Sequence, residues 1–265
     1  MASTAANTKS KPSPRTMRVK DKQWITPNMI RVTCMAEWIS TLTPGIEGAH
    51  FKLFLPKQDQ IEADFLRQLE DGPRPDVRTY TIRFLRVECA EMDIDFVDHG
   101  DAGPASAWAR RCSNGDVVGF AGPGPIKLKE FHAKTYVLAA DMSALPVVAA
   151  TLEAMPRDAK GVAFFEITTL NDKQEINAPK GIDIQWFEHP HPHEPLSQSI
   201  DAIISLPELA GPVQTCIAGE SSMIKAVREE IVNRRGVPKS NAYISGYWKI
   251  GLIEDQHQEF KRQMG

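Results

Sequence analysis

Residues 135–146 read TYVLAADMSALP, and their pattern indicates the fold class of the second half of the chain. Its first six residues are nearly all apolar, which is typical of a strand buried on both faces of a parallel sheet. A helical pattern follows over residues 143–155, and a second one covers residues 221–235. Three further apolar runs lie at residues 161–167, 182–187 and 213–218. This alternation of strands and helices predicts a parallel α/β sheet.

The two ends of the chain extend this picture. Toward the C-terminus, we expect a fifth strand at residues 242–247 and a polar helical tail at 253–263. In the first half, short β-rich runs are separated by Gly, Pro, Asn and Asp residues, as in a small antiparallel barrel. The predicted barrel strands lie at residues 18–24, 29–36, 50–55, 77–87, 93–97 and 116–121. Residues 58–76 are predicted to form an acidic loop with a helical turn at 63–69.

These patterns predict a β + α/β fold: a six-stranded antiparallel β-barrel, then a parallel-sheet α/β nucleotide-binding domain. We expect the barrel domain over residues 16–131 and the α/β domain, with its helical tail, over 132–265. Residues 1–15 are rich in Ser, Thr, Lys and Pro and lack an apolar core, so we expect a disordered leader without a secretory signal.

Composition narrows the range of functions. The chain has 265 residues, with 31 basic and 34 acidic side chains and a formal net charge of −3, which argues against a nucleic-acid-binding protein. No apolar run is long enough to cross a membrane. The four cysteines form no CxxC pair, which argues against a zinc site or a redox dithiol and suits reduced thiols in a cytoplasmic protein.

The segment 78–81, Arg78-Thr79-Tyr80-Thr81, is a candidate cofactor-binding strand. An arginine fork can bind two phosphate oxygens at once, and a tyrosine offers a flat face to an aromatic ring system. A threonine hydroxyl or backbone group can serve a ring nitrogen. The alternative is an exposed Arg and a half-buried Tyr that simply form part of a barrel wall.

A second candidate segment is DFVDHGDAGPASAWA, at residues 95–109. The predicted strand ends at Val97, Gly100 and Gly103 favour a tight turn, and Pro104 suits the first position of a helix. The open N–H groups of such a helix would form an anion site that suits a pyrophosphate. The alternative is a strand–turn–helix connection without a ligand, in which His99 is structural.

The chain contains two further segments that could be read as sites. ADMSALP follows a strand and opens a helix, the position that a dinucleotide takes in an α/β sheet, although no GxGxxG is present and a plain junction is the alternative. The segment 189–193, HPHPH, suggests a metal site, but its prolines favour an extended loop that does not gather the three imidazoles on one face. We therefore predict no metal site.

The chain resembles the siderophore-interacting protein family in three segments. These are RTYT at 78–81, DIDFVDHGDAGPASAWA at 93–109 and NGDVVGFAGPGP at 114–125. These proteins are flavin-dependent ferric-siderophore reductases of the ferredoxin-reductase superfamily. The likeness continues through ADMSALP at 140–146 and AGE at 218–220 and ends at GYWKIG, residues 246–251. It covers about residues 15–260.

The resemblance implies a non-covalent FAD and a set of residues for it. The implied FAD-binding residues are Arg78, Thr79, Tyr80, Thr81, Asp95, Val97, His99, Gly103, Pro104, Ala105, Ser106, Trp108 and Trp248. The implied site for a nicotinamide donor comprises Asp141, Ser143, Ala144, Leu145, Pro146, Gly219 and Glu220. Lys52 and Lys249 are the implied substrate-binding residues. Asp98 departs from the family pattern, because many relatives are expected to have an apolar residue there.

The implied activity is the reduction of ferric siderophores by a cytoplasmic, monomeric flavoenzyme. Electrons would pass from NADH, NADPH or a ferredoxin through FAD to Fe(III), and no catalytic residue beyond the flavin is needed. Trp248 would shield the flavin ring and control access of the nicotinamide. The alternatives are a flavin or ferredoxin-type reductase with another acceptor, and a non-enzymatic siderophore-binding protein. The segment 168–173, TTLNDK, contains both an acid and a base and does not decide the donor.

Overall fold

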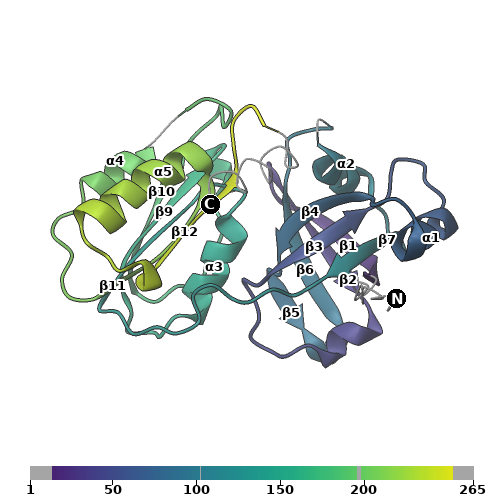
Figure 1. Ribbon diagram of the computed structural model, residues 1–265, viewed down its shortest axis with the longest axis horizontal. Helices are drawn as coiled ribbons and strands as arrows, with labels where there is room; N and C mark the ends of the chain where they lie inside the picture. Colours follow the sequence, from purple (N-terminus) through teal and green to yellow (C-terminus); the bar gives the residue numbers. More distant parts are fainter. Residues whose placement is uncertain (1–13, 102, 196–197, 253–265) are drawn as a thin grey trace, which may run out of the picture.

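The computed structural model describes residues 14–101, 103–195 and 198–252. These residues form two sheets that lie side by side in Figure 1, an antiparallel barrel-like sheet and a parallel sheet flanked by helices. The predicted fold class is therefore confirmed. The predicted helical tail at 253–263 and most of the predicted leader lie outside the described residues.

The N-terminal sheet has seven antiparallel strands among the described residues, in the order β4-β3-β7-β1-β2-β6-β5. Its strands are β1 (Arg15–Thr26), β2 (Met29–Met35), β3 (His50–Leu55), β4 (Asp76–Thr81), β5 (Phe84–Arg86), β6 (Glu91–Val97) and β7 (Val117–Ala121). The sheet curls on itself, so that edge strand β4 approaches β6 on the far side of the strand order. The Tyr80 ring of β4 packs against the Phe96 ring of β6 with centroids 4.4 Å apart. Its core includes Phe51, Leu53 and Phe120.

The prediction of six barrel strands was wrong by one, because the run 77–87 forms two strands, β4 and β5. The chain changes partner between them. The N–H of Ile82 donates to the carbonyl of Ala49, whereas the N–H of Arg83 donates to the carbonyl of Asp93 on β6. The break thus turns the chain from β3 to β6 and lets Arg83 leave the barrel toward the second domain.

Helices α1 (Glu62–Asp71) and α2 (Pro104–Arg111) pack on the barrel, and short 3-10 helices cover Glu37–Thr41 and Val87–Cys89. Only a helical turn was expected at 63–69. The structure has a ten-residue helix there, since Phe65 and Leu69 bury themselves against Val117. The apolar face of α1 thus gains a partner that lies far away in sequence.

The C-terminal sheet is parallel, in the order β10-β9-β8-β11-β12. Its strands are β8 (Thr135–Ala140), β9 (Lys160–Ile167), β10 (Gly181–Glu188), β11 (Val213–Glu220) and β12 (Ala242–Trp248). Its helices are α3 (Leu145–Ala154), α4 (Gln198–Ile204) and α5 (Ser221–Arg228), and π-helical turns at Glu229–Arg234 continue α5. Short 3-10 helices cover Leu170–Asp172 and Lys239–Asn241.

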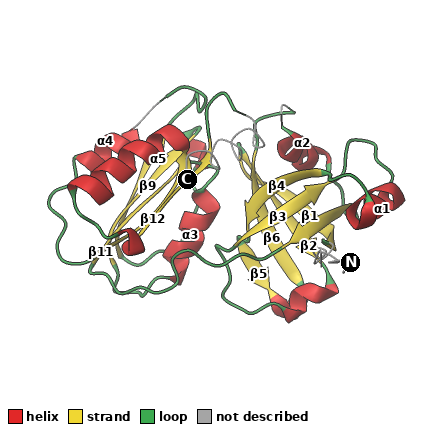
Figure 2. Ribbon diagram, in the orientation of Figure 1, coloured by secondary structure: helices red, strands yellow, loops and turns green. Residues whose placement is uncertain are grey.

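Figure 2 shows α3 on the barrel side of this sheet and α4 and α5 on the other. Side chains of β8 alternate between the two layers: Leu138 and Ala140 pack with α3, whereas Val137 and Ala139 pack with α4 and α5. The chain order reverses between β8 and β11, so their carboxyl ends form the switch point where ligands of open parallel sheets bind.

The two domains are joined by apolar and polar contacts. Met29, Ile25 and Val97 of the barrel join the hydrophobic cluster around α3. Arg83, which is 2% exposed, makes two hydrogen bonds of 2.6 and 2.9 Å to Glu153 of α3. These contacts fix the position of α3, whose first turn lies at the switch point. Within the described residues, no helix is long and apolar enough to cross a membrane.

Candidate functional site

The predicted flavin strand is β4, an edge strand of the barrel sheet. Thr79 is exposed and Thr81 is buried, whereas Arg78 and Tyr80 are half-buried. Lys52, directly opposite on β3, donates from Nζ to Thr79 Oγ1 at 2.5 Å. One predicted substrate lysine is thus attached to the predicted flavin strand.

The second predicted flavin segment forms the expected strand–turn–helix. β6 ends at Val97, Gly100 has a φ of +74°, and α2 begins at Pro104 with Gly103 as its N-cap. A Cβ atom on Gly103 would lie 2.6 Å from His99 Cε1, so only glycine allows this approach of the His99 ring. No side chain of the described residues caps the α2 N-terminus, which leaves it suited to an anion.

Asp98 is held inside this turn rather than projecting outward as an unpaired charge. Its carboxylate accepts hydrogen bonds from Gly100 N at 3.0 Å, Ser106 Oγ at 3.1 Å and Arg110 Nη1 at 3.0 Å. Burial acts to raise its pKa, but these three donors outweigh burial and hold the pKa below its usual range. The acid therefore braces the turn, and Arg110 neutralises its charge.

Several predicted flavin residues have packing or ion-pair partners within the protein. Asp95, which is 4% exposed, accepts from Arg31 Nε and Nη2 at 2.7 and 2.8 Å. Trp108 is 2% exposed and packs on Phe96, and Ala105 and Ser106 are also buried. A direct contact of these residues with a flavin remains a prediction.

The predicted donor residues meet at the switch point. Asp141 follows β8, and its Oδ1 accepts from Ser143 N at 2.9 Å, Ser143 Oγ at 2.6 Å and Ala144 N at 3.2 Å. Its Oδ2 accepts from Trp248 Nε1 at 2.7 Å. Desolvation raises the pKa of Asp141, although its hydrogen bonds act in the opposite direction. Leu145 and Pro146, in the first turn of α3, are buried.

Glu220 and Gly219 lie beside this cluster at the end of β11. The Glu220 carboxylate caps α5 by accepting from Ser222 N and Met223 N, and it also accepts from Ile250 N at 3.2 Å. A Cβ atom on Gly219, whose φ is +154°, would lie 2.8 Å from Asp141 Oδ2. The structure thus brings Asp141, Gly219, Glu220 and Trp248 into one contiguous cluster.

The remaining aromatic and basic residues lie around β12. Trp248, the last residue of β12, packs against the His193 ring in a T-shaped arrangement, with centroids 5.7 Å apart. Lys249 follows it, on a different domain from Lys52. That the two lysines face one substrate stays a prediction. Among the described residues, no group of three His, Cys, Asp or Glu side chains could hold a metal ion.

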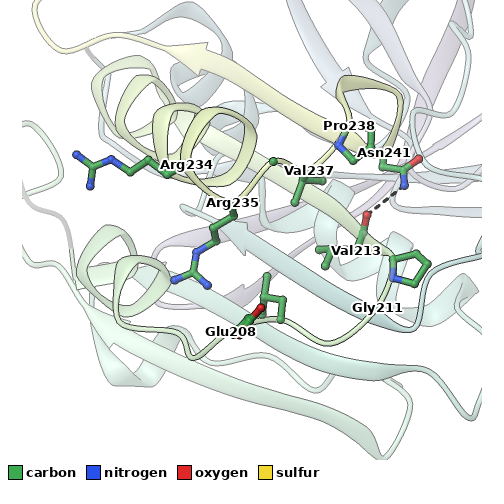
Figure 3. A pocket seen from close by; sticks show the side chains of 11 residues that line it. Glu208, Gly211, Val213, Arg234, Arg235, Val237, Pro238 and Asn241 are labelled. Atoms are coloured by element: carbon green, nitrogen blue, oxygen red, sulfur yellow. Dashed lines mark hydrogen bonds between the residues drawn. The ribbon is translucent and has the colours of Figure 1, made fainter.

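A cavity of about 460 Å³ lies elsewhere, at the amino ends of β11 and β12 (Figure 3). Arg235 lines it, but that guanidinium already donates to Glu230 Oε1 and to the carbonyls of Pro207, Ile204 and Leu206. A cation at the C-terminus of α4 is a stabilising contact with the helix dipole. This cavity lies at the edge of the sheet opposite the switch point and is not the candidate site.

Asp172 and Arg83 join the two domains, and neither is among the predicted site residues. Asp172 is fully buried and accepts from Thr26 Oγ1 at 2.7 Å and from Asn28 N and Nδ2 at 2.9 and 2.8 Å, all in the barrel domain. A local signal existed: Thr169 and Asp172 form a capping box, which the spacing T-x-x-D allows. Its barrel partners have no signal in the sequence.

Comparison with known proteins adds to this geometry. Residues 18–126 match the siderophore-interacting FAD-binding domain, and residues 133–251 match the siderophore-interacting protein family. The ferric vibriobactin reductase ViuB of Vibrio cholerae is 32% identical, and the alignment covers 93% of each chain. A ferric acinetobactin reductase of Acinetobacter baumannii is 25% identical over 72% of this chain and 66% of its own.

Solved structures give the same result. The siderophore-interacting protein SipS from Aeromonas hydrophila superposes with a TM-score of 0.82 at 29% identity, over 95% of this chain and 98% of its own. A ferredoxin reductase of carbazole 1,9a-dioxygenase, at 15% identity and a TM-score of 0.65 over 88% of this chain and 69% of its own, shares the fold. With a barrel that matches the family's FAD-binding domain and an α/β domain that matches its second half, the chain belongs to the siderophore-interacting protein family.

Proposed function

We propose that the protein is a cytoplasmic FAD-dependent ferric-siderophore reductase that releases iron as Fe(II). This proposal is carried by two features of the barrel domain. Strand β4 contains Arg78 and Tyr80, and no side chain of the described residues caps the N-terminus of α2. The printed names of the relatives ViuB and the acinetobactin reductase give the substrate class. We further propose that the protein acts as a monomer and without nucleic acid or membrane partners.

The residues fit a bound FAD. Arg78 would bind a phosphate from the barrel edge, the α2 N-terminus would hold the pyrophosphate, and Tyr80 would present its ring to the flavin. Phe96 backs the Tyr80 ring and Trp108 backs Phe96, at centroid distances of 4.4 and 5.6 Å, so the ring is held in place by a packed aromatic row. When bound, FAD supplies the ability to take up an electron pair and release electrons singly.

The protein itself supplies alignment and charge. Ferric chelates that are anionic would be attracted by Lys52, whose ammonium group is positioned by Thr79, and by Lys249. Ammonium groups act as point charges and do not demand one chelate shape, so we expect several siderophores to be accepted. The electron donor is proposed to be NADH, NADPH or a ferredoxin.

Flavin retention tests the cofactor assignment. We expect Arg78→Ala to weaken FAD binding about tenfold to a hundredfold, because a charge-assisted hydrogen bond contributes about 1.5–3 kcal/mol. Flavin occupancy after gel filtration, from absorbance near about 450 nm as for a bound flavin, is the measurement. Arg74→Ala, on an exposed arginine just before β4, is the matched control. An Arg78→Ala variant as yellow as this control would contradict the assignment.

Substrate docking has a separate test. Lys52→Ala and Lys249→Ala should each raise the KM for a ferric siderophore about threefold to thirtyfold, through the loss of roughly 0.7–2 kcal/mol of binding. The effect should shrink at high salt, which screens the charges. Lys57→Ala, on an exposed lysine just after β3, serves as control. Equal KM values for all three variants at low salt would exclude both lysines from docking.

A further inference from the structure

Two helix N-termini meet at the switch point, and each is occupied by a carboxylate of the chain itself. Asp141 follows β8 and Glu220 ends β11, and these strands are hydrogen-bonded neighbours, with Ala218 opposite Ala140. In α/β nucleotide-binding domains, such helix ends offer N–H groups and a positive dipole end to the phosphates of a dinucleotide. A phosphate could use only those N–H groups that have no acceptor inside the protein.

At α3 the N–H groups are already used. Ser143 N and Ala144 N donate to Asp141 Oδ1, and Leu145 N donates to the Asp141 carbonyl at 2.8 Å. Pro146 has no N–H group, and Val147 N donates to the Ala144 carbonyl at 3.2 Å. From residue 143 to 147, every backbone N–H therefore has an acceptor inside the protein.

At α5 the arrangement is similar. One Glu220 oxygen accepts from Ser222 N and Met223 N, and the other accepts from Ile250 N, which ties the cap to the segment after β12. Trp248 Nε1 donates to Asp141 Oδ2 and links this segment to the other carboxylate. Gly219 allows Asp141 to lie against the end of β11, because a Cβ atom at position 219 would lie 2.8 Å from Asp141 Oδ2.

The barrel domain shows the opposite arrangement. At α2 the N-cap is Gly103, and no side chain of the described part of the chain accepts from its first turn. The same molecule thus keeps one helix end open to an anion and places carboxylates on two others. A pyrophosphate at the switch point would meet like charge and would have to displace internal hydrogen bonds.

We propose that Asp141 and Glu220 are specificity-determining residues that weaken the binding of electron donors carrying a pyrophosphate, such as nicotinamide dinucleotides. The proposal rests on the proposed reductase function and reverses the role that the family resemblance implies for these two residues, from donor binding to donor exclusion. A donor that needs no phosphate site in the α/β domain is correspondingly favoured.

Calorimetric titration of the flavin-loaded protein with ADP-ribose tests this, since ADP-ribose carries the pyrophosphate without the nicotinamide. The wild type should bind it with a Kd of about 1 mM or weaker. Glu220→Gln removes the charge, and its amide oxygen can still accept from Ser222 N and Met223 N, although the hydrogen bond from Ile250 N is lost. It should tighten binding about tenfold. Glu229→Gln, an exposed acid at the far end of α5, is the matched control and should bind like the wild type. Adenosine, which has no phosphate, should bind all three equally.

A second variant covers the other carboxylate. Asp141→Asn would place an amide N–H against Trp248 Nε1–H, so Trp248→Phe is combined with it to remove that clash, and Trp248→Phe alone is the reference. The double variant should also bind ADP-ribose about tenfold more tightly than its reference. Micromolar binding by the wild type would overturn the proposal, as would failure of both charge-removing variants to tighten binding. Loss of FAD from the wild type on gel filtration would count against the proposed function and would leave the proposed effect of the two carboxylates on pyrophosphate binding unaffected.

Discussion

Replacing Asp172 by Ala should break the polar contact that joins the β1–β2 turn to the loop after β9. The Asp172 carboxylate is fully buried and accepts five hydrogen bonds. Three come from Thr26 and Asn28 of the barrel domain, and two come from Thr169 N and Oγ1 at 3.0 and 3.1 Å. Alanine would leave all of these donors without their acceptor.

The expected loss follows from these bonds. A hydrogen bond to a charged group contributes about 1.5–3 kcal/mol, but bonds that share one carboxylate are not additive. We therefore expect Asp172→Ala to lower the free energy of unfolding by about 3–5 kcal/mol at pH 7, because each buried donor left without an acceptor costs about 1–3 kcal/mol. Asp183→Ala, on an exposed acid of β10, is the control and should change it by less than about 0.5 kcal/mol.

The pH dependence gives an independent check. Burial acts to raise the pKa of Asp172, but hydrogen bonds from Asn28, Thr26 and Thr169 outweigh it and hold the pKa below the usual range. A lowered folded-state pKa means that the stabilisation is complete above the unfolded-state pKa of about 3.9 and is lost as the pH falls through the folded-state value. The gap between wild type and Asp172→Ala should thus narrow below about pH 4.

Urea unfolding of wild type, Asp172→Ala and Asp183→Ala, followed by circular dichroism at several pH values, measures both effects. A loss of less than about 1 kcal/mol at pH 7 would contradict the assigned role of the Asp172 contacts. A gap that widens as the pH falls below about 4 would contradict the lowered pKa.

Two further predictions concern buried groups. Arg83→Met and Glu153→Gln should each lower the free energy of unfolding in urea by about 3–5 kcal/mol, because each leaves a charged partner behind at the domain contact. The double variant should lose less free energy of unfolding than the sum of the two single losses. Additive losses would show that the pair is not coupled. Of the four thiols, the exposed Cys89 should react rapidly with a disulfide reagent in the native protein. Burial raises the pKa of Cys112 to about 11, that of Cys216 to about 12 and that of Cys34 further, so these three should react only after denaturation; rapid native reaction of more than one thiol would refute this.

The order of the elements could be predicted from the sequence because their patterns are local. The strands His50–Leu55 and Thr135–Ala140 begin and end where the apolar runs do. The break between β4 and β5 could not be predicted, since the run 77–87 has a continuous β pattern. What interrupts it is a change of partner strand and the burial of Arg83 against Glu153, both set by distant segments.

The candidate site shows the same division. The positions of Asp141, Gly219, Glu220 and Trp248 at one sheet edge follow from parallel topology, which the sequence indicates. Their hydrogen bonds to one another do not follow from it. The assignment of these residues to a donor site stays a prediction. Asp98 departs from the family pattern, and its contact with Arg110 could not be predicted, because Arg110 lies twelve residues away on a helix whose register decides the contact.

All strands of the antiparallel sheet lie between residues 15 and 121, in the first half of the chain, whereas the parallel sheet ends with β12 at residue 248. During synthesis at about 5–20 residues per second, the barrel therefore leaves the ribosome many seconds before β12 can join β11. We expect the barrel to fold first, with Ile25, Met29 and Val97 exposed to water until α3 covers them. The nascent chain thus passes through a stage with an apolar patch that a chaperone could bind.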